Sequence, residues 1–292
     1  MAISHRLHSP MDVRPDDEIN EAPKRIIFLS VEGNETEKNY FNCVDKYREV
    51  LGIQSLVHVE ILSRFQRDGK SDPQQVFELL QECISLKKDG ILTRDICTCL
   101  AGTGEQYSEE DVEKYLNGEL QESKNKELDR ALQFAQIDLD YQKYLCDFKG
   151  ENGNDIFAIV IDRDKESHSD EEMKQIFQKC EEKGCKCFLS NPCFEFWLLL
   201  HVCDVETELK DKYDDILKNE KISKKHTFVS NELSKIAHHG KSISEGKFKQ
   251  IYLSQIDTAI KRARSFAENE EDLLNQIGTN IPNLFAILRE KI

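Results

Sequence analysis

The sequence predicts an α/β fold built on buried parallel strands. Two apolar runs, Arg25–Val31 and Ile156–Ile161, are rich in β-branched and aromatic residues and end at charged or turn residues. Both are too short for independent helices, and such runs are typical of strands covered on both faces. Helical patterns lie between the apolar runs, which indicates helices packed against a central sheet.

Bulk composition sets the limits of this prediction. The 292 residues allow one large domain or two ordinary ones, and 39% apolar residues are enough for a core. No run approaches the ~20 apolar residues that a membrane helix needs. The N-terminus has no apolar segment typical of a secretory signal, so we expect a cytoplasmic protein without membrane contact.

The first part of the chain predicts an arm and then a strand and a helix. Residues 1–24 mix Pro, His, Asp and Arg without periodicity, and we expect a disordered arm there. After the strand Arg25–Val31 and a turn, a helix should run to about Val50, capped by Thr36 or Asn34. One stripe of this helix is apolar and should be buried: Tyr40, Phe41, Val44 and Tyr47.

A second strand is expected over Leu56–Leu62, because apolar and polar residues alternate there. A charged loop over 64–72 follows, and Pro73 favours the first turn of the next helix. The buried face of that helix should comprise Val76, Leu79, Leu80 and Ile84.

Residues 88–150 predict a helical insertion before the third strand. They carry many charges, with helical stretches around Glu109–Leu120 and Glu127–Cys146. The Gly102-Thr103-Gly104 segment is not a nucleotide-binding fingerprint, because no strand–turn–helix pattern frames it.

The second half of the chain predicts two more strands and then helices. After the strand Ile156–Ile161 we expect a polar loop, a helix over Asp170–Lys183 ended by Gly184, and a short strand over Cys185–Leu189. Pro192 lies near the start of a mostly apolar, buried helix. Residues 204–292 look helical throughout, with a last helix from about Asn283.

Acidic residues stand where two of the predicted strands end. Glu32 follows the first strand, and Asp162 and Asp164 follow the third. Ligands of open α/β sheets bind at the carboxyl ends of strands, so these side chains can converge. Three carboxylates in one place repel each other unless a hard cation neutralises them, which predicts Mg²⁺ or Mn²⁺. The alternatives are an ordinary turn at Glu32 and a helix cap at the Asp-x-Asp corner.

Glu195 is a further candidate, because it lies inside the apolar helix that follows Pro192. A buried carboxylate is costly unless it is paired or binds a ligand. We therefore expect a catalytic role for Glu195; the alternative is that Asn191, His201 or the backbone satisfies it.

The distribution of charge favours a phosphate-bearing ligand. The net charge of −15 argues against a general nucleic-acid coat protein, but residues 218–264 hold eleven Lys or Arg against four acids, a local charge of +7. A basic lobe beside an acidic metal pocket suits a polymer of phosphates. The candidates for binding it are Lys165, Lys241, Lys247 and Lys249, with Arg163 as a further cationic clamp. A solvated helical surface is the alternative.

The ten cysteines should be reduced thiols in a cytoplasmic protein. Their tightest clusters are Cys97–Cys99 and Cys180–Cys187, without two matched pairs of the spacing that structural zinc sites use. Small buried hydrophobic side chains are the favoured interpretation, with zinc as the alternative.

The motifs together resemble a known family. A strand-end Glu-Gly-x-x-Thr-Glu at 32–37 and a later Asp-x-Asp at 162–164 are similar to the Toprim domain of topoisomerases, primases and related nucleases. The string Ser-Asn-Pro-Cys-Phe-Glu-Phe-Trp-Leu-Leu-Leu-His at 190–201 resembles the RloB family, Toprim-containing bacterial proteins found beside restriction and phage-defence systems. The likeness is best over residues 25–87 and 156–203.

The resemblance implies a Toprim core of about four parallel strands over residues 25–203, interrupted by the insertion, and a helical basic region over 204–292. It implies that Glu32 acts near the scissile phosphate and that Asp162 and Asp164 hold the metal. The expected function is a metal-dependent nuclease acting on RNA, with tRNA-like RNA as one candidate, in antiviral (abortive infection) defence. DNA cleavage, a non-catalytic module that binds a nucleotide or a defence-system partner, and a primase-like nucleotidyl transferase are the alternatives, and a homo-oligomer stays open.

Overall fold

The computed structural model describes residues 25–33, 35–54, 57–62, 73–102, 104, 106–135, 137–139, 142, 155–165, 168–223, 226–238 and 242–291. The expected N-terminal arm, the charged loop, Asn34 and Lys241 lie outside these residues. By internal contacts the described residues 81–142 form one unit and all the others a second, which holds the sheet and the C-terminal helices together.

The second unit is built on a sheet whose strand order is β2-β1-β3-β4-β5. Four strands are parallel, which confirms the α/β prediction: β1 (Arg25–Val31), β2 (Val57–Leu62), β3 (Ile156–Asp162) and β4 (Lys186–Asn191). A fifth strand of two residues, β5 (Gly278–Thr279), was not expected and runs antiparallel to β4.

Both faces of the sheet are buried, as the continuous apolar strands predict. Ile27, Leu29 and Val31 of β1 belong to the main core, which they share with α1 (Thr36–Lys46) and the C-terminal helices. The alternate residues Ile26 and Phe28 are fully buried as well.

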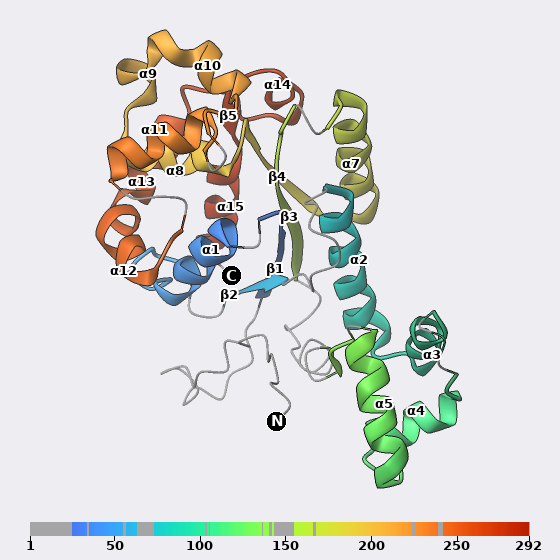
Figure 1. The fold of residues 1–292 in the computed structure, drawn as a ribbon. Helices are drawn as coiled ribbons and strands as arrows, with labels where there is room; N and C mark the ends of the chain where they lie inside the picture. The colour runs from blue at the N-terminus through green and yellow to red at the C-terminus, as the bar shows by residue number, and fades with distance from the viewer. Residues whose placement is uncertain are drawn as a thin grey trace. The chain divides into compact units, whose positions relative to one another are not determined.

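Two helices cover the second face of the sheet (Figure 1). These are α7 (Asp170–Lys183) and the first turns of α2 (Pro73–Asp89). They are joined by Lys179, whose Nζ donates to Gln74 Oε1 at 2.6 Å.

The helix α8 (Phe194–Val202) lies at the centre of the main core. Its residues 194–201 are all buried, including the fully buried Trp197, because apolar side chains surround the helix on every side. The helices α11 (Phe228–Ala237) and α13 (Ile256–Ala263) pack against it. Arg262 of α13 donates to the carbonyl oxygens of Leu200 and His201, which satisfies the end of α8.

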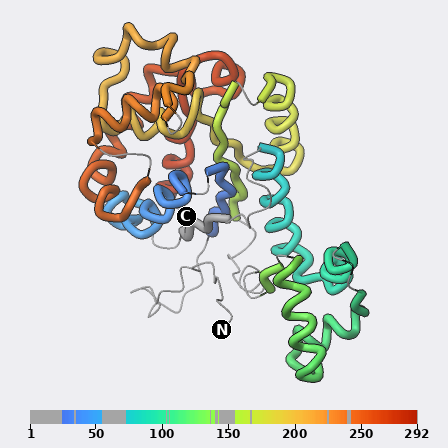
Figure 2. Tube along the Cα trace, viewed as in Figure 1, coloured from blue at the N-terminus to red at the C-terminus, as the bar shows by residue number. Residues whose placement is uncertain are grey.

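Apart from α11, α13 and β5, the described residues from 204 to 291 form mostly short helical segments. One of these, α12 (Glu245–Lys247), lies beside α1 although it is far from it in sequence (Figure 2). Glu245 makes this link, since it accepts from Lys46 and Tyr47. The segments are α9 (Val205–Glu208), η2 (Lys210–Lys212), α10 (Tyr213–Lys218), α12 (Glu245–Lys247), η3 (Phe248–Tyr252), η4 (Leu253–Gln255), α14 (Glu270–Leu273) and α15 (Ile281–Leu288).

The first unit has a small core of its own. It contains the end of α2 together with α3 (Thr93–Ala101), α4 (Glu109–Leu116) and α5 (Glu122–Phe134). Its buried residues include Ile96, Leu100, Val112, Leu128 and Leu132. The expected stretch Glu109–Leu120 is found as α4, which ends at Leu116. The stretch expected over Glu127–Cys146 overlaps α5, which begins at Glu122 and ends at Phe134, and residues 143–146 lie outside the described part of the chain.

Several expected boundaries were wrong in detail. The helix α1 ends at Lys46, not near Val50, and Glu35 is its N-cap residue while Thr36 is already helical. Along α2, Leu79 and Ile84 are only partly buried. Phe77 and Cys83 are buried instead, because the buried stripe of α2 is rotated from the one that the sequence suggested. The last helix begins at Ile281, two residues early.

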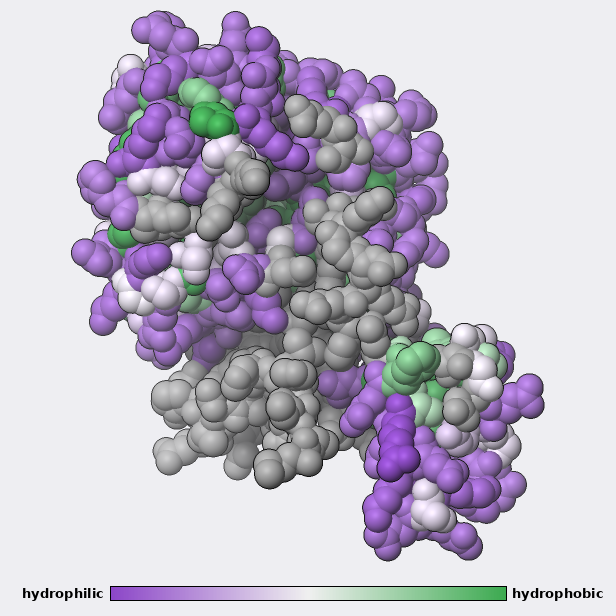
Figure 3. All heavy atoms as spheres, viewed as in Figure 1, coloured by the Kyte–Doolittle hydropathy of each residue, from purple (hydrophilic) through white to green (hydrophobic). Residues whose placement is uncertain are grey.

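The described residues contain no helix long and apolar enough to cross a membrane. On the face drawn in Figure 3, most of the coloured surface is hydrophilic. Large exposed hydrophobic side chains are scattered along the chain: Val50, Leu92, Phe134 and Ile222.

The strand β5 depends on a close approach of two backbone segments. Ala267 donates to Ile277 and accepts from Thr279, each at 3.0 Å, so residue 278 faces Ala267 with no space between them. A Cβ atom on Gly278 would collide with the Ala267 carbonyl group. Only glycine lets this segment lie at the edge of β4.

We expect Gly278→Ala to lower the free energy of unfolding by about 1–3 kcal/mol, because the backbone must move to admit the methyl group. Gly246→Ala in α12 is the matched control: its Cβ would meet nothing, and the change should be neutral or stabilising. Urea denaturation followed by circular dichroism measures both. Equal midpoints for the two variants would contradict the tight approach at β5.

Candidate acidic site at the carboxyl edge of the sheet

The parallel pairing of β1 with β3 brings Glu32 beside Asp162. The two strands run in register from Ile27 opposite Ile156, so their carboxyl ends lie together. The Glu32 amide continues this ladder by donating to Val160 O at 2.9 Å. The Glu32 carboxylate turns back across the strand end, and its Oε2 accepts from the Asp162 amide at 2.8 Å.

Asp162 is held in turn by the start of α8. Its Oδ1 accepts from the backbone amide of Phe194, the first residue of that helix, at 2.8 Å. The first amides of a helix have no partner within it and carry the positive end of the helix dipole. Asp162 therefore satisfies one of these amides, and the dipole favours its charged form.

Two more buried acids belong to the same cluster. Glu37 lies in the first turn of α1 and Glu195 in the first turn of α8, and each is only 7% exposed. The Glu37 carboxylate lies against the backbone of the turn at residue 33, where a Cβ would collide with it. Gly33 thus makes room for the second acid of the Glu-Gly-x-x-Thr-Glu motif.

The electrostatics of Asp162 show that the cluster is strained. Burial raises the pKa of Asp162 well above its usual range, and the negative charges of Glu32, Glu37 and Glu195 raise it further. The hydrogen bond from Phe194 acts in the opposite direction but is the weakest of these effects. A raised pKa means that this carboxyl stabilises the fold at pH below the pKa of the unfolded chain. That stability is lost as pH rises through the pKa of the folded state.

Asp164 occupies a different position at the same corner. Its residue is exposed, and its backbone amide donates to Pro192 O at 3.3 Å. The charges that act on Asp162 come from Glu32, Glu37 and Glu195. The structure thus brings Glu32, Asp162 and Glu195 together as the sequence suggests, with Asp164 on the outer side of the corner.

Arg163 does not serve as a clamp at the cluster, contrary to one suggestion of the sequence. Its side chain is buried and holds the fold by donating to Leu274 O, His168 O and Asp170. Arg163 can point away from Asp162 because consecutive residues at a strand end face opposite sides of the sheet.

Two of the candidate lysines are engaged by groups away from the acidic cluster. Lys165 Nζ donates to Asn275 Oδ1 at 2.9 Å, and Lys247 Nζ donates to Ser242 O at 3.2 Å. Lys249 lies exposed in η3. Their suggested role in binding a phosphate backbone stays a prediction.

Two polar neighbours suggested as partners for Glu195 are committed to other groups. Asn191 donates to Leu273 O at 2.7 Å. His201 contacts Trp197 O at 2.9 Å and the Tyr40 hydroxyl at 3.1 Å, and burial lowers its pKa to about 3. His201 is therefore neutral at physiological pH. It donates through Nδ1 to the carbonyl, which leaves Nε2 to accept from Tyr40.

The negative charge of Glu195 is felt by a different side chain. It raises the pKa of the Tyr252 hydroxyl, after the larger effect of burial. Tyr252 belongs to the aromatic cluster around Tyr40, with Phe248 and His201. The acidic site thus lies against an apolar wall, which strengthens charge interactions inside it.

The donor set of the site fits a hard divalent cation. Every candidate ligand is a carboxylate, the ligand type that Mg²⁺ and Mn²⁺ prefer. In the described part of the chain, however, no three acidic, histidine or cysteine side chains are arranged as a ready metal site. One oxygen of Glu32 and one of Asp162 already accept from backbone amides. The residue types therefore suit a divalent cation, but their oxygens are not gathered around one point.

The two cysteine clusters differ in exposure. Cys180, Cys185 and Cys187 are buried near the end of α7 and in β4, as the favoured interpretation of the sequence expects. Cys97 and Cys99 lie in α3, where Cys97 is partly exposed and Cys99 is exposed, so that interpretation does not describe them.

Sequence reasoning missed Glu37 as a member of the cluster. Its signal was present, because an acid in the first turn of a helix that follows a strand lies at the same sheet edge as the strand end. The motif alone did not show whether Glu35 or Glu37 faces the site. In the structure the Glu37 carboxylate is the one that faces the site, and it occupies the space beside Gly33.

The fold and the site define an α/β protein with an acidic site at the carboxyl edge of a mostly parallel sheet. A family model described as RloB-like protein matches residues 27–288, nearly the whole chain. The chain therefore belongs to the RloB-like family. Searches of curated proteins and of solved structures found no match.

We expect Asp162→Asn to raise the melting temperature at pH 8 in EDTA by roughly 2–4 °C, the shift that about 1 kcal/mol gives in a domain of this size. The amide keeps the acceptor for Phe194 and removes the negative charge that the neighbouring acids repel. At pH 4, where the carboxyl of Asp162 already holds its proton, the gain should shrink.

The matched control for this variant is Asp211→Asn in η2, where the residue is exposed. Differential scanning calorimetry of both variants at pH 4 and pH 8 gives the comparison. A lower melting temperature for Asp162→Asn at pH 8, or the same gain at both pH values, would count against the charge cluster.

Proposed function

We propose that this RloB-like protein is a divalent-metal-dependent nuclease that hydrolyses phosphodiester bonds. The observation that carries the proposal is the meeting of Glu32 and Asp162 at the neighbouring carboxyl ends of β1 and β3. The charges of Glu32, Glu37 and Glu195 act on Asp162 and, after burial, raise its pKa. Such repulsion among buried acids lowers stability unless a cation is bound, and perturbed carboxyls of this kind concentrate at functional sites. We further propose that the sheet is a Toprim core, as the motifs suggest.

Glu32 and Asp162 would hold Mg²⁺ or Mn²⁺, with Asp164 and Glu195 as further ligands. A bound divalent ion neutralises charge on the phosphoryl oxygens and makes water more acidic. Glu32 would exchange a proton with the attacking water or the leaving oxygen. Its hydrogen bond from the Asp162 amide, which keeps its carboxylate beside Asp162, supports this role. The start of α8 supports the negative charge of Asp162 during these steps.

RNA, with tRNA-like RNA as one candidate, is the substrate that we favour, and antiviral defence by abortive infection is the setting. This choice rests on analogy with Toprim effectors in defence systems. The basic stretch of residues 218–264 supports a polyanionic ligand of either kind, and DNA is the alternative substrate.

A second candidate function is a non-catalytic module that binds a nucleotide or a protein partner. One observation favours it: the described side chains do not form a ready metal site. In that case the acidic cluster would be a binding surface whose charge is met by the ligand.

The nuclease proposal predicts cleavage of at least one of tRNA, single-stranded RNA and plasmid DNA in Mg²⁺ or Mn²⁺. Glu32→Gln and Asp162→Asn should each lower the rate by at least ~100-fold, because each removes a charge that acts on the reacting groups. Gel analysis of end-labelled substrates measures the rates. Glu171→Gln, an exposed acid on α7, is the control and should keep the wild-type rate. No cleavage, or equal rates for all variants, would reject the proposal.

The metal proposal predicts that millimolar Mg²⁺ or Mn²⁺ raises the melting temperature by mass action. The gain should disappear in Asp162→Asn and on addition of EDTA, and it should persist in Asp211→Asn. Thermal melts followed by intrinsic fluorescence measure it. Unchanged melting in both ions would show that the cluster does not bind them in the free protein.

A further inference from the structure

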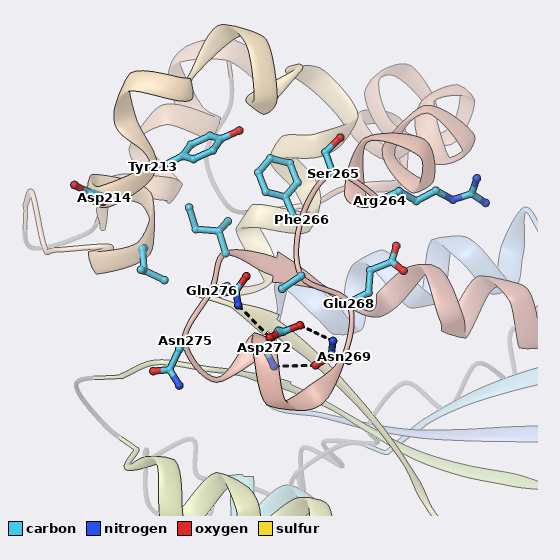
Figure 4. Close-up of a pocket in the computed structure, with 13 residues that line it drawn as sticks. Tyr213, Asp214, Arg264, Ser265, Phe266, Glu268, Asn269, Asp272, Asn275 and Gln276 are labelled. Atoms are coloured by element: carbon cyan, nitrogen blue, oxygen red, sulfur yellow. Dashed lines mark hydrogen bonds between the residues drawn. The ribbon is translucent and has the colours of Figure 1, made fainter.

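A pocket of about 660 Å³ opens in the same unit as the acidic site, and the reaction outlined above does not use it. Its walls come from α10, from the segment after α13, and from the chain between α14 and β5 (Figure 4). The side chains that decide its chemistry are Tyr213, Arg264, Phe266, Asp272, Asn275 and Gln276.

One wall of the pocket is aromatic. Tyr213 and Phe266 lie with ring centroids 5.7 Å apart at an interplanar angle of 62°, and each is partly exposed. Phe266 is fixed from behind by Phe196 of α8, at 5.2 Å. A partly exposed, rigidly supported aromatic pair is a surface on which a flat ring stacks.

Two exposed carboxamides also line the pocket. Asn275 accepts from Lys165, which can only donate, so in this arrangement its nitrogen is left to donate. Gln276 donates to Asp272 Oδ1 at 3.0 Å, so its oxygen is left to accept. One donor and one acceptor are the kinds of group that recognise the edge of a nucleobase.

The carboxylate of Asp272 is already used within the pocket. Its Oδ2 accepts from Asn269 Nδ2 at 2.6 Å, and its Oδ1 accepts from Gln276 (Figure 4). With both oxygens engaged, Asp272 orients Asn269 and Gln276 and is a poor anchor for a cation. The other charged lining residues are Asp214, Glu268 and Arg264, which carry both signs, so a basic ligand is one outcome that the test below must exclude.

The wall of the pocket is tied to the acidic site by three consecutive residues. Asn191 donates to Leu273 O, Arg163 to Leu274 O, and Lys165 to Asn275. All three donors flank the cluster, since Arg163 and Lys165 follow Asp162 and Asn191 precedes α8. The residues that flank the carboxylates therefore also hold this wall of the pocket in place.

We propose that this pocket binds one nucleobase of the nucleic acid whose phosphate reaches the acidic site, and so sets the base preference of cleavage. The proposal rests on the nuclease function proposed above. Tyr213 stacks on the base, and Asn275 and Gln276 bind its edge.

The direct test measures nucleoside binding in full-length Glu32→Gln protein by saturation-transfer NMR, which needs no catalysis. The probes are the four nucleoside 5′-monophosphates, ribose 5-phosphate as the baseless control, and arginine amide as a cationic probe. We expect the base protons of at least one nucleotide to receive saturation and ribose 5-phosphate to receive none. Tyr213→Leu and Gln276→Leu, each added to Glu32→Gln, should weaken binding at least about fivefold.

Gln178→Leu is the matched control. Gln178 is exposed on α7 and donates to Glu182, as Gln276 donates to Asp272. It should bind as its parent does. Gln276 is exposed, so its variant tests the pocket even where Tyr213→Leu unfolds. Binding of arginine amide in place of nucleotides, equal binding of ribose 5-phosphate, or equal weakening by Gln178→Leu would overturn the proposal.

A second experiment maps cleavage ends on randomised RNA and DNA oligonucleotides with otherwise wild-type protein. A base preference at one position, lost in Gln276→Leu and kept in Gln178→Leu, supports the pocket. Cleavage with an unaltered preference in Gln276→Leu overturns the pocket and leaves the nuclease intact. Nucleotide binding that depends on Tyr213, in a protein that cuts nothing, rejects the nuclease and supports a nucleobase site.

Discussion

The bond from the Phe194 amide to Asp162 is the constraint on which the site depends. It joins the end of β3 to the start of α8, two segments separated by thirty-two positions in the chain. Glu32 completes the join from β1 by accepting from the Asp162 amide. Both bonds use a side-chain oxygen to satisfy a backbone amide, so a substitution that removes either acceptor oxygen leaves a backbone donor unpaired.

This arrangement explains how four acids come to lie together in a stable fold. Glu37 and Glu195 stand in the first turns of α1 and α8, where the helix dipole partly offsets their charge. The offset is incomplete, because the pKa of Asp162 is still raised well above its usual range. The remaining repulsion is what a bound cation or a positively charged partner would remove.

The strands and the position of the acids followed from sequence because they depend on local patterns. The run Arg25–Val31 was predicted to the residue, and Glu32 lies at the strand end as expected. Glu37 was missed because the sequence does not show that its carboxylate lies in the space beside Gly33. The role of Arg163 was wrong because its partners, Leu274 and Asp170, cannot be deduced from spacing. The strand β5 was missed since two residues carry no periodic signal and Gly278 is fixed by Ala267, a contact of tertiary origin.

The same tertiary contacts give the C-terminal region its part in the site. The segment 273–275 accepts hydrogen bonds from Arg163, Lys165 and Asn191. The chain before β5 is therefore held in place by residues that flank the acidic site. The same chain continues through Gly278 into a ladder with Asn191 and Ser190. A displacement of this segment must therefore break bonds at the corner itself. For that reason a base bound in the pocket beside it would affect the position of the residues that flank the carboxylates. An isolated surface pocket would have no such connection.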